Sequence, residues 1–486
     1  MSGADLGLMA MAMLLGVPAV AALVLVLVSG YRLGAGLNVG AALLCLLAAA
    51  VLFQARPEAN LYLRVDDFNI YLIALNNWVS FTTSVFSAGY IAHELETGRL
   101  TPAYLRFYHA MYQALLFAMN LALLANNIGL LWVAIELATL VTVLMVGLYR
   151  THAALEAAWK YFILGSLGIA LALFGTILVY LAAQPAIGQG LPAMAWDRLL
   201  ARADAFDPAL LNLAFIFLLL GYGTKAGLVP LHAWLPDAHA EGPTPISAVL
   251  SGLLLNVALY AVLRFKMLMS ANPSALAPGP LMVGLGLLSL LFAGLMLYRR
   301  GDIKRLFAYS SIEHMGIITF AFGMGGPLAN FAGLLHMTLH SLTKSAIFFA
   351  VGHISQVKET QRISTIRGLT ATHPLLGWGL VIGVIAIAGM PPFGVFMSEF
   401  LVVSSTFSRE PWLALPLVLG LLLGFGLLLW RLHEMAFGES RGANAPGPAP
   451  ITALPMITHL ALVLVAGIWL PGPLVDWFRH VAALLG

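Results

Sequence analysis

The sequence predicts an all-α integral membrane protein with about fourteen transmembrane helices. Of its 486 residues, 61% are hydrophobic and only 9% are charged, a balance that a soluble globular protein of this length does not have. The apolar residues also form long continuous stretches, and a helix that spans the hydrocarbon core needs about 20 mainly apolar residues. Lipid is therefore the expected solvent for most of the chain.

The apolar stretches are separated by short connections. They cover residues 8–28, 33–53, 69–91, 109–126, 128–149, 159–182, 209–229, 245–265, 279–298, 305–323, 329–354, 377–407, 412–433 and 450–471. The longest connections lack apolar periodicity and are too short for a folded extramembrane domain. We therefore expect one membrane domain over residues 1–486. Its predicted parts are three N-terminal helices (1–108), a first repeat (109–265), a second repeat (279–433) and a last helix (450–471).

The distribution of basic residues predicts the orientation. Alternate connections carry fourteen and eight Lys or Arg residues, and the richer side is expected to face the inside of the cell. Both termini then lie outside. No basic segment precedes the first stretch, so it is expected to be a retained helix and not a cleaved signal peptide. The chain is predicted to be a multi-pass protein of a bacterial or archaeal plasma membrane.

Cysteine content and net charge exclude several classes of function. Cys45 is the only cysteine, so this chain alone cannot form a disulfide or a four-thiolate iron–sulfur site. We expect no cofactor in this chain, and electron carriers would lie on other subunits. The net charge of +3 is small and spread over short loops, which gives no reason to expect a nucleic-acid partner.

Two of the predicted spans contain residues that interrupt helices. The seventh contains the segment KAGLVP at 225–230, and the twelfth contains GMPPFG at 389–394. Proline removes a backbone donor and clashes with the preceding turn, so the helix must unwind there. In a membrane, such backbone is stable only where protein or a water-filled cavity satisfies it. The paired breaks favour two inverted five-helix repeats, spans 4–8 and 9–13, although proline can also simply kink a helix.

Four ionisable residues within the predicted spans are candidates for a proton relay: Glu136, Lys225, Lys344 and Glu399. Such residues are costly in a membrane and are functional candidates by default. Buried carboxyl and amine groups can be tuned to exchange protons near neutral pH. A Glu136–Lys225 pair would hold the lysine protonated, and separating the pair would release its proton. The alternative is a fixed ion pair that ties two helices together.

The eleventh span carries a polar stripe formed by His336, His340 and Lys344. Residues at positions i, i+4 and i+8 share one face of a helix, and imidazoles one turn apart suit a proton wire. Histidines in membranes also serve as hydrogen-bond donors between helices. A metal or haem site is the less favoured alternative, because no carboxylate or cysteine lies in that stretch to complete the ligands. We therefore expect no metal site.

A polar connection follows Lys225 and contains His232, Asp237, His239 and Glu241. These groups could load protons at the mouth of a path. Solvated or helix-capping roles are equally expected for Asp237 and Glu241, whereas His232 lies near the break and is the stronger candidate.

The tenth span begins with basic residues and continues with two more ionisable ones. Lys304 and Arg305 are expected to anchor the inner interface. Glu313 and His314 lie deeper, and we predict that they contribute to a water or proton path.

Several long motifs resemble one known family. The segment KAGLVPLHAWLPDAH from Lys225, the segment DIKRLFAYSSI from Asp302 and the His336/His340/Lys344 pattern resemble the antiporter-like membrane subunits of complex I, of cation/proton antiporter complexes and of group 4 membrane hydrogenases. The likeness covers nearly the whole chain. It implies that Glu136 and Lys225 form the coupling pair of one half-channel, that Lys344 is the central relay lysine, and that Glu399 lies on the exit side.

One position departs from the family pattern. Many members have a lysine in the eighth span where this chain has Asn256, and asparagine can bind water but cannot carry a proton charge. Asn256 together with the segment SIEH ending at His314 is most similar to the F component of hydrogenase-4. Glu399 in place of lysine, and the short segment after Pro471, are similar to the M-type subunit of complex I and to hydrogenase relatives.

The expected function is a proton-translocating, non-redox subunit of a redox-driven membrane complex of the hydrogenase or complex I type. Its expected partners are other membrane subunits and peripheral subunits with [NiFe] or iron–sulfur centres. The alternatives are a complex I M-type subunit, a D subunit of a sodium/proton antiporter complex, a solute permease using the broken helices, and a structural anchor. Protons are favoured over Na⁺, because a lysine-centred path disfavours a dehydrated cation.

Overall fold

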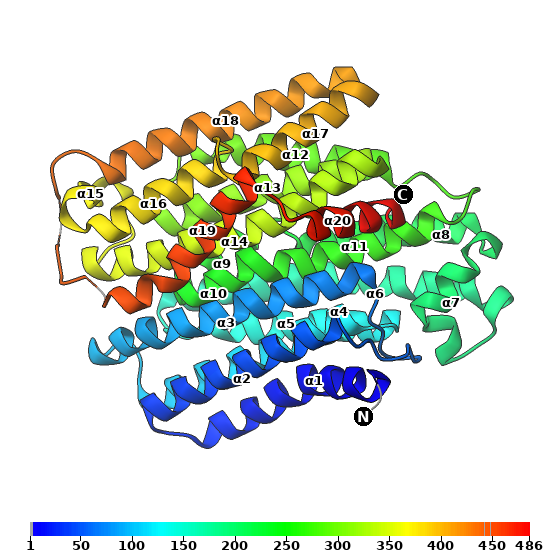
Figure 1. Cartoon of the computed structure of the whole chain (residues 1–486), viewed down its shortest axis with the longest axis horizontal. Coiled ribbons are helices and arrows are strands. Elements are labelled where there is room, and N and C mark those ends of the chain that lie inside the picture. Colours follow the sequence, from blue (N-terminus) through cyan, green and yellow to red (C-terminus); the bar gives the residue numbers. More distant parts are fainter. Residues whose placement is uncertain (1–2, 442, 448) are drawn as a thin grey trace.

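The chain folds into a bundle of long helices that lie roughly side by side (Figure 1). The computed structural model describes residues 3–441, 443–447 and 449–486. Within these ranges no strand forms, and the β-type pairing is limited to isolated bridges. The two termini lie toward the same end of the helices in Figure 1. The predicted all-α class is confirmed.

The helices follow one another with few long connections. They are α1 Gly3–Leu27, α2 Tyr31–Leu52, α3 Asp67–Glu96, α4 Pro102–Leu124, α5 Ile128–Val146, α6 His152–Ile187, α7 Trp196–Ala201, α8 Pro208–Lys225, α9 Trp234–Glu241, α10 Thr244–Val249, α11 Leu255–Ser270, α12 Gly279–Leu297, α13 Ile303–Met324, α14 Gly326–Lys358, α15 Leu369–Thr372, α16 Pro374–Ile387, α17 Gly394–Arg409, α18 Pro411–Ala436, α19 Leu454–Ile468 and α20 Gly472–Leu484.

Every predicted apolar stretch falls on one or two of these helices. In the described part of the chain, 11 helices are long and apolar enough to cross a membrane. The more polar α3 and α13, and the short α16 and α17, are not among them. The multi-pass membrane architecture is therefore confirmed, while the count of fourteen spans stays a prediction.

Both predicted helix breaks are present. α8 ends at Lys225 and the helix resumes only at Trp234, whose indole Nε1 donates to the carbonyl of Thr224 at 2.8 Å. Ser289 accepts a hydrogen bond from the backbone N–H of Val229 at 2.9 Å. Side chains thus satisfy backbone groups that the unwound segment leaves free, as burial in a membrane requires. The second break separates α16 from α17, between Ile387 and Gly394. The inverted repeats that the breaks suggest stay a prediction.

Two helices form the centre of the bundle. α14 has 33 residues, and 94% of its most apolar stretch of 18 residues is buried. α10 and α11 form one continuous helix, Thr244–Ser270, through a π-helical turn. The most apolar 18 residues of this helix are entirely buried. Because neighbouring helices shield both elements from lipid, polar side chains can be accommodated on them.

The end of the chain adds a helix that the sequence did not predict. α20 buries Phe478 and Val481, and the carbonyl of Gly486 accepts hydrogen bonds from Asn330 of α14 and Lys266 of α11 at 2.7 and 3.4 Å. Lys266 and Arg264, which the orientation prediction assigns to an outer connection, are instead buried in the last turns of α11. Arg264 pairs with Asp66, and Lys266 donates to the carbonyls of Leu485 and Gly486, so both side chains have partners inside the protein.

Candidate functional site

Glu136 of α5 and Lys225 of α8 lie next to each other. The Lys225 Nζ is 4.0 Å from Glu136 Oε2, and the side chain of Lys225 is 1% exposed and that of Glu136 20%. Neither of these two atoms has a hydrogen-bond partner among the described residues. The pairing expected between these residues is therefore present. The distance is too long for a hydrogen bond but allows electrostatic attraction between the two charges.

The helix break and a glycine shape the surroundings of Lys225. It is the last residue of α8, so its side chain projects from the point where the helix unwinds. Its Nζ lies 5.8 Å from the centre of the Tyr161 ring, which stacks on Trp234 at 4.1 Å. A Cβ atom at Gly165 would stand 2.7 Å from the Nζ. The ammonium therefore occupies space that any larger residue at Gly165 would take.

His232 is buried in the α8–α9 connection but contacts other groups than the Glu136–Lys225 pair. Its ring meets the edges of Phe292 and Tyr309, with ring centres 4.9 and 6.2 Å apart. Its Nδ1 has no partner among the residues described. The structure thus places His232 near the break and leaves its role in the relay a prediction.

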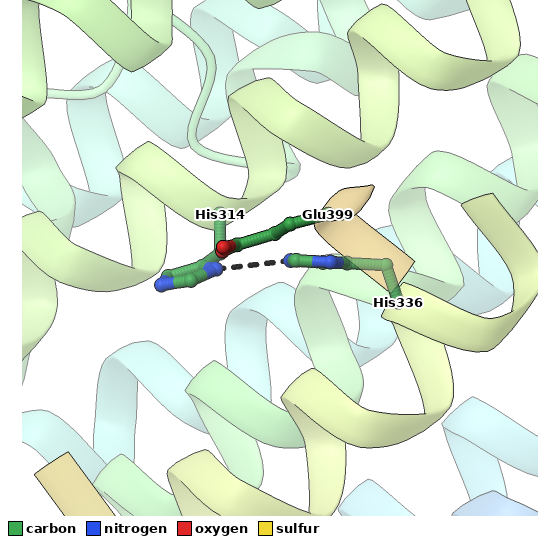
Figure 2. A group of neighbouring side chains, drawn as sticks. All are labelled: His314, His336 and Glu399. Atoms are coloured by element: carbon green, nitrogen blue, oxygen red, sulfur yellow. Dashed lines mark hydrogen bonds between the residues drawn. The ribbon is translucent and has the colours of Figure 1, made fainter. Parts of the chain in front are cut away.

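A second cluster brings together His314 of α13, His336 of α14 and Glu399 of α17 (Figure 2). His314 Nδ1 and His336 Nε2 are 2.9 Å apart, a hydrogen-bond distance, and their rings stack with centres 5.2 Å apart. His336 Nδ1 lies 2.9 Å from Ser398 Oγ. One potential ligand atom from each of the three residues lies within 4.8 Å of the others. Protons can pass directly between the two imidazoles, with a carboxylate beside them.

The cluster adds a carboxylate to the histidines considered for metal binding. No carboxylate stands near the histidines along α14 itself, yet α17 supplies Glu399 from a distant part of the sequence. Two imidazoles and a carboxylate are a ligand set that suits zinc-like ions. The hydrogen bond between His314 and His336 already uses one nitrogen of each ring. The geometry accounts for a hydrogen-bonded pair, and the absence of a metal stays a prediction.

His340 and Lys344 continue along α14. The His340 ring stacks on His314 with centres 5.8 Å apart, and neither of its nitrogens has a partner in the described part of the chain. Lys344 Nζ donates to the carbonyl of Phe307 at 3.0 Å and lies 5.7 Å from the centre of that residue's ring. His336, His340 and Lys344 are 0% exposed. The predicted polar stripe is thus wholly enclosed by protein.

Glu313 lies on α13 and is 3% exposed. Its Oε2 has no partner among the described residues, and its carboxylate fits against Gly424 of α18 so closely that a Cβ atom there would collide with it. Its charge acts on Lys344. Glu313 and His314 are adjacent in sequence, but the two side chains serve different neighbours.

Asn256 links the two central helices. Its amide nitrogen donates to Ser341 Oγ at 2.7 Å and to the carbonyl of Met337 at 3.3 Å. Its Oδ1 has no partner among the described residues, and the side chain lines a cavity of about 10 Å³ beside Asn76, roughly the room that one water requires. None of these contacts is to an ionisable group, so Asn256 can hold water but does not itself extend the relay.

Comparisons with known proteins identify the family. A family model described as "NADH:quinone oxidoreductase/Mrp antiporter, TM" matches residues 125–424. The chain belongs to this family. It is 61% identical over 469 residues to the "Hydrogenase-4 component F homolog" of Methylacidiphilum infernorum, covering 96% of this chain and 98% of that one. It is 32% identical over 260 residues to the "NADH-quinone oxidoreductase subunit M" of Escherichia coli K12, covering 53% of this chain and 51% of that one.

A solved structure with the same fold belongs to the membrane-bound sulfane sulfur reductase, described as an archaeal respiratory membrane complex. The TM-score is 0.87 at 24% identity, covering 98% of this chain and 97% of that one. This antiporter-like subunit therefore has the fold that the motifs implied. The resemblance to hydrogenase-4 component F and to the M-type subunit is confirmed, and the chain is an antiporter-like membrane subunit of the complex I and group 4 hydrogenase class.

One of the two interface predictions for this antiporter-like subunit needs revision. Lys304 is 1% exposed and its Nζ donates to the carbonyls of Ala240 and Gly242 at 3.0 and 2.6 Å, because α9 ends directly against the start of α13. It therefore holds a helix end inside the protein and does not reach a lipid headgroup. Arg305 is 37% exposed and forms ion pairs with Asp237 and Glu241 at 3.2 and 3.6 Å. These contacts fit structural roles for both acids.

Buried polar residues that sequence reasoning missed lie nearby. His239, expected only as a group at the mouth of the path, is 0% exposed and its ring stacks on Phe348 of α14 at 4.9 Å. Glu94 of α3 is also 0% exposed and is absent from the predicted candidates. It lies near the end of an apolar stretch, and its burial depends on helices that are distant in the sequence. Its position in the sequence therefore does not indicate that it is buried.

Proposed function

We propose that this chain conducts protons across the membrane as one module of a redox-driven complex. The observation that carries the proposal is the Glu136–Lys225 pair, enclosed in the bundle at the point where α8 unwinds. Ionisable side chains buried in a membrane are expensive and persist where they serve transport. Backbone that unwinds at the same place can admit the water that a proton needs.

The second cluster supports the same function. Lys344, His340, His336 and His314 lie on two packed helices, α13 and α14, and Glu399 joins them from the helix after the second break. We propose the order from Lys344 through the histidines to Glu399, with Glu313 adjusting the charge near Lys344. Separation of Glu136 from Lys225 would let the lysine release its proton toward this second cluster, and water beside Asn256 would assist the passage.

The chain's partners are proposed from its relatives. By its name the Escherichia coli relative is a subunit of NADH-quinone oxidoreductase, and the similar structure belongs to a complex described as an archaeal respiratory membrane complex. We therefore propose other membrane subunits as neighbours here. Peripheral subunits with [NiFe] or iron–sulfur centres would supply the redox energy, while this chain would hold no cofactor. We also propose that the basic-rich connections face the cytoplasm of a bacterium or archaeon, which places both termini outside.

Sodium transport is the alternative within the family. The family model is described as including the Mrp antiporter. Dehydrated Na⁺ requires several oxygen ligands, whereas Lys225 and Lys344 place ammonium groups on the path. We therefore favour protons.

The test is proton pumping by the purified parent complex in sealed vesicles. Lys225→Ala and Lys344→Ala should each reduce pumping and coupled turnover while the complex stays intact on a native gel. Lys160→Ala is the control, because Lys160 is exposed and pairs with Glu156 and Asp237 at the surface. Pumping at the wild-type rate in both buried-lysine variants would reject the relay, and a requirement for Na⁺ in place of H⁺ would favour the alternative.

A further inference from the structure

Glu94 of α3 is a fully enclosed carboxylate outside the relay described above. Tyr149 donates its hydroxyl to Glu94 Oε2 at 3.0 Å, and Gln356 of α14 donates its amide to Oε1 at 2.9 Å. The guanidinium of Arg99 is 3.8 Å from Oε2, but Arg99 is 54% exposed, so solvent screens most of that attraction. A carboxylate of this kind is costly to bury with so few partners.

A cavity adjoins Glu94 on the side of the basic-rich connections. It has a volume of about 270 Å³ and is lined by His93, Glu96, His353, Gln356 and Thr452, among others. Such a polar cavity has room for several waters. Gln356 lines the cavity and also contacts Glu94, so one amide separates the carboxylate from the water. We call this cavity the vestibule.

His353 adds a titratable group to the wall of the vestibule. Its Nδ1 lies 3.3 Å from Gln356 Oε1, and its Nε2 has no partner among the described residues. His353 thus places a titratable imidazole in the wall of the vestibule. Gln356 cannot carry charge, but it can orient the water and the carboxylate on its two sides.

Charged and titratable groups continue from Glu94 toward the second cluster. The charge of Glu94 acts on Lys304, whose ammonium is held by the last turn of α9. His239, on that same helix, stacks its ring on Phe348 of α14, one helical turn from Lys344. Both of its nitrogens are without a partner in the described part of the chain. Lys304 and His239 therefore meet at α9, and His239 adjoins the part of α14 that carries Lys344.

We propose that Glu94 is the proton-loading residue for the second cluster, with the vestibule as its inlet from the inside. When the Gln356 amide turns away from Oε1, the Glu94 carboxylate takes a proton from hydronium in the vestibule and leaves water there. The resulting carboxylic acid gives that proton to a water chain toward His239 and Lys344, which restores the carboxylate. This inference rests on the proposed proton transport, because it assigns an entry point to the same path.

A purely structural role is the competing explanation, since the hydrogen bonds of Glu94 join α3 to α14. Gln356 also donates to the carbonyl of Tyr90 of α3 at 3.1 Å. That bond joins the same two helices without any charge. Glutamine at position 94 would keep the size of the side chain and an acceptor for Gln356. This substitution therefore distinguishes a role of the charge from a role in helix packing.

The experiment measures proton pumping by the reconstituted parent complex with Glu94→Gln, Glu94→Asp and the control Glu359→Gln, whose residue is exposed at the end of α14. We expect Glu94→Gln to lower pumping by about tenfold or more in an assembled complex, and Glu94→Asp to keep part of it. Wild-type pumping by Glu94→Gln, together with loss of pumping in Lys344→Ala, would overturn the inlet and leave the proposed function standing. Wild-type pumping by both would reject the function itself.

A chemical rescue distinguishes proton loading from packing. Glu94→Ala opens space beside the vestibule that a small acid can enter. Formate, whose carboxylate can take up and release a proton, should restore pumping, whereas nitrate, an anion of similar size and charge that is too weak a base to be protonated, should not. Equal rescue by both anions would mean that the site needs only a filled cavity or a negative charge, and would overturn the loading role.

Discussion

Lys225 Nζ lies 4.0 Å from the carboxylate of Glu136, and Lys225 is also the residue at which α8 ends. The pair therefore joins α5 to the end of α8, directly before the segment in which the helix unwinds. A small rearrangement of that segment would change the distance between the charges, and electrostatic attraction in a poorly solvated site depends strongly on such changes. The pair is suited to act as a gate.

Glu136→Gln should disable the gate and destabilise the protein. The substitution leaves the buried Lys225 ammonium without its charge partner, which costs up to about 3 kcal/mol. Pumping should fall, and the thermal unfolding midpoint of the purified chain in detergent should decrease. The double variant Glu136→Gln/Lys225→Met removes both charges and should recover stability but not pumping. Full pumping by the double variant would contradict the gate.

Gly165→Ala should impair pumping without preventing assembly. The added Cβ would stand 2.7 Å from Lys225 Nζ, and the flexible lysine must move away from its place beside Glu136. Misplacement of a reacting group by about 1 Å can lower a rate by tenfold or more. The matched control is Gly284→Ala in α12, where nothing lies within 4 Å of the new atom. Equal pumping by the two variants would show that the position of Lys225 does not matter.

Ser398→Ala should reduce pumping moderately. Ser398 Oγ lies 2.9 Å from His336 Nδ1, and this contact helps fix which nitrogen of His336 faces His314. Loss of one neutral hydrogen bond costs about 1 kcal/mol, or a factor of about five. The control is Ser408→Ala, because Ser408 is exposed on the same helix and bonds only to the carbonyl of Ser405. Identical rates for both variants would argue against a role for the His336 orientation.

Asp66 should make stability depend on pH in the acidic range. Burial alone would raise the pKa of Asp66, but the charges of Arg264 and Arg64, with a hydrogen bond from the Asn69 backbone, hold the pKa below its ordinary value. The folded state then binds a proton less readily than the unfolded state. The stabilisation is present above the unfolded value of about 3.9 and is lost as the pH falls through the lower folded value.

Asp66→Asn tests this relationship directly. The Arg264 guanidinium lies 2.7 Å from Asp66 Oδ2 and is 5% exposed, so removing the carboxylate should cost about 3 kcal/mol at neutral pH. The variant should also lose part of the acid dependence of thermal unfolding. An unfolding midpoint that falls with acid equally in the variant and the wild type would assign that dependence to other groups.

The parts of the fold that were predictable depend on local chemistry. Proline and glycine at 227–230 and 389–394 break helices wherever those helices pack, so the ends of α8 and α16 could be placed from sequence. Few charges occur in the apolar stretches, which limited the partners available to Lys225. Glu136 was therefore one of very few possible partners for Lys225, and the contact between them could be predicted.

The remaining features depend on how distant helices pack. Glu399 joins His314 and His336 only because α17 lies against α13 and α14, which no sequence spacing records. Lys304 follows a basic turn and was expected at the interface, yet α9 covers it. α20 was not predicted, because its buried residues are few and become apparent only when it lies on α14. Tertiary contacts decided each of these outcomes.

The most direct test of proton conduction by this chain is the number of protons translocated per turnover in the reconstituted parent complex carrying Lys344→Ala, compared with Lys160→Ala. This ratio does not depend on how much complex is assembled. Lys344 is fully buried and held by the Phe307 carbonyl, so its loss should lower the ratio, whereas the surface variant should keep the wild-type value. An unchanged ratio in Lys344→Ala would contradict a relay through this chain.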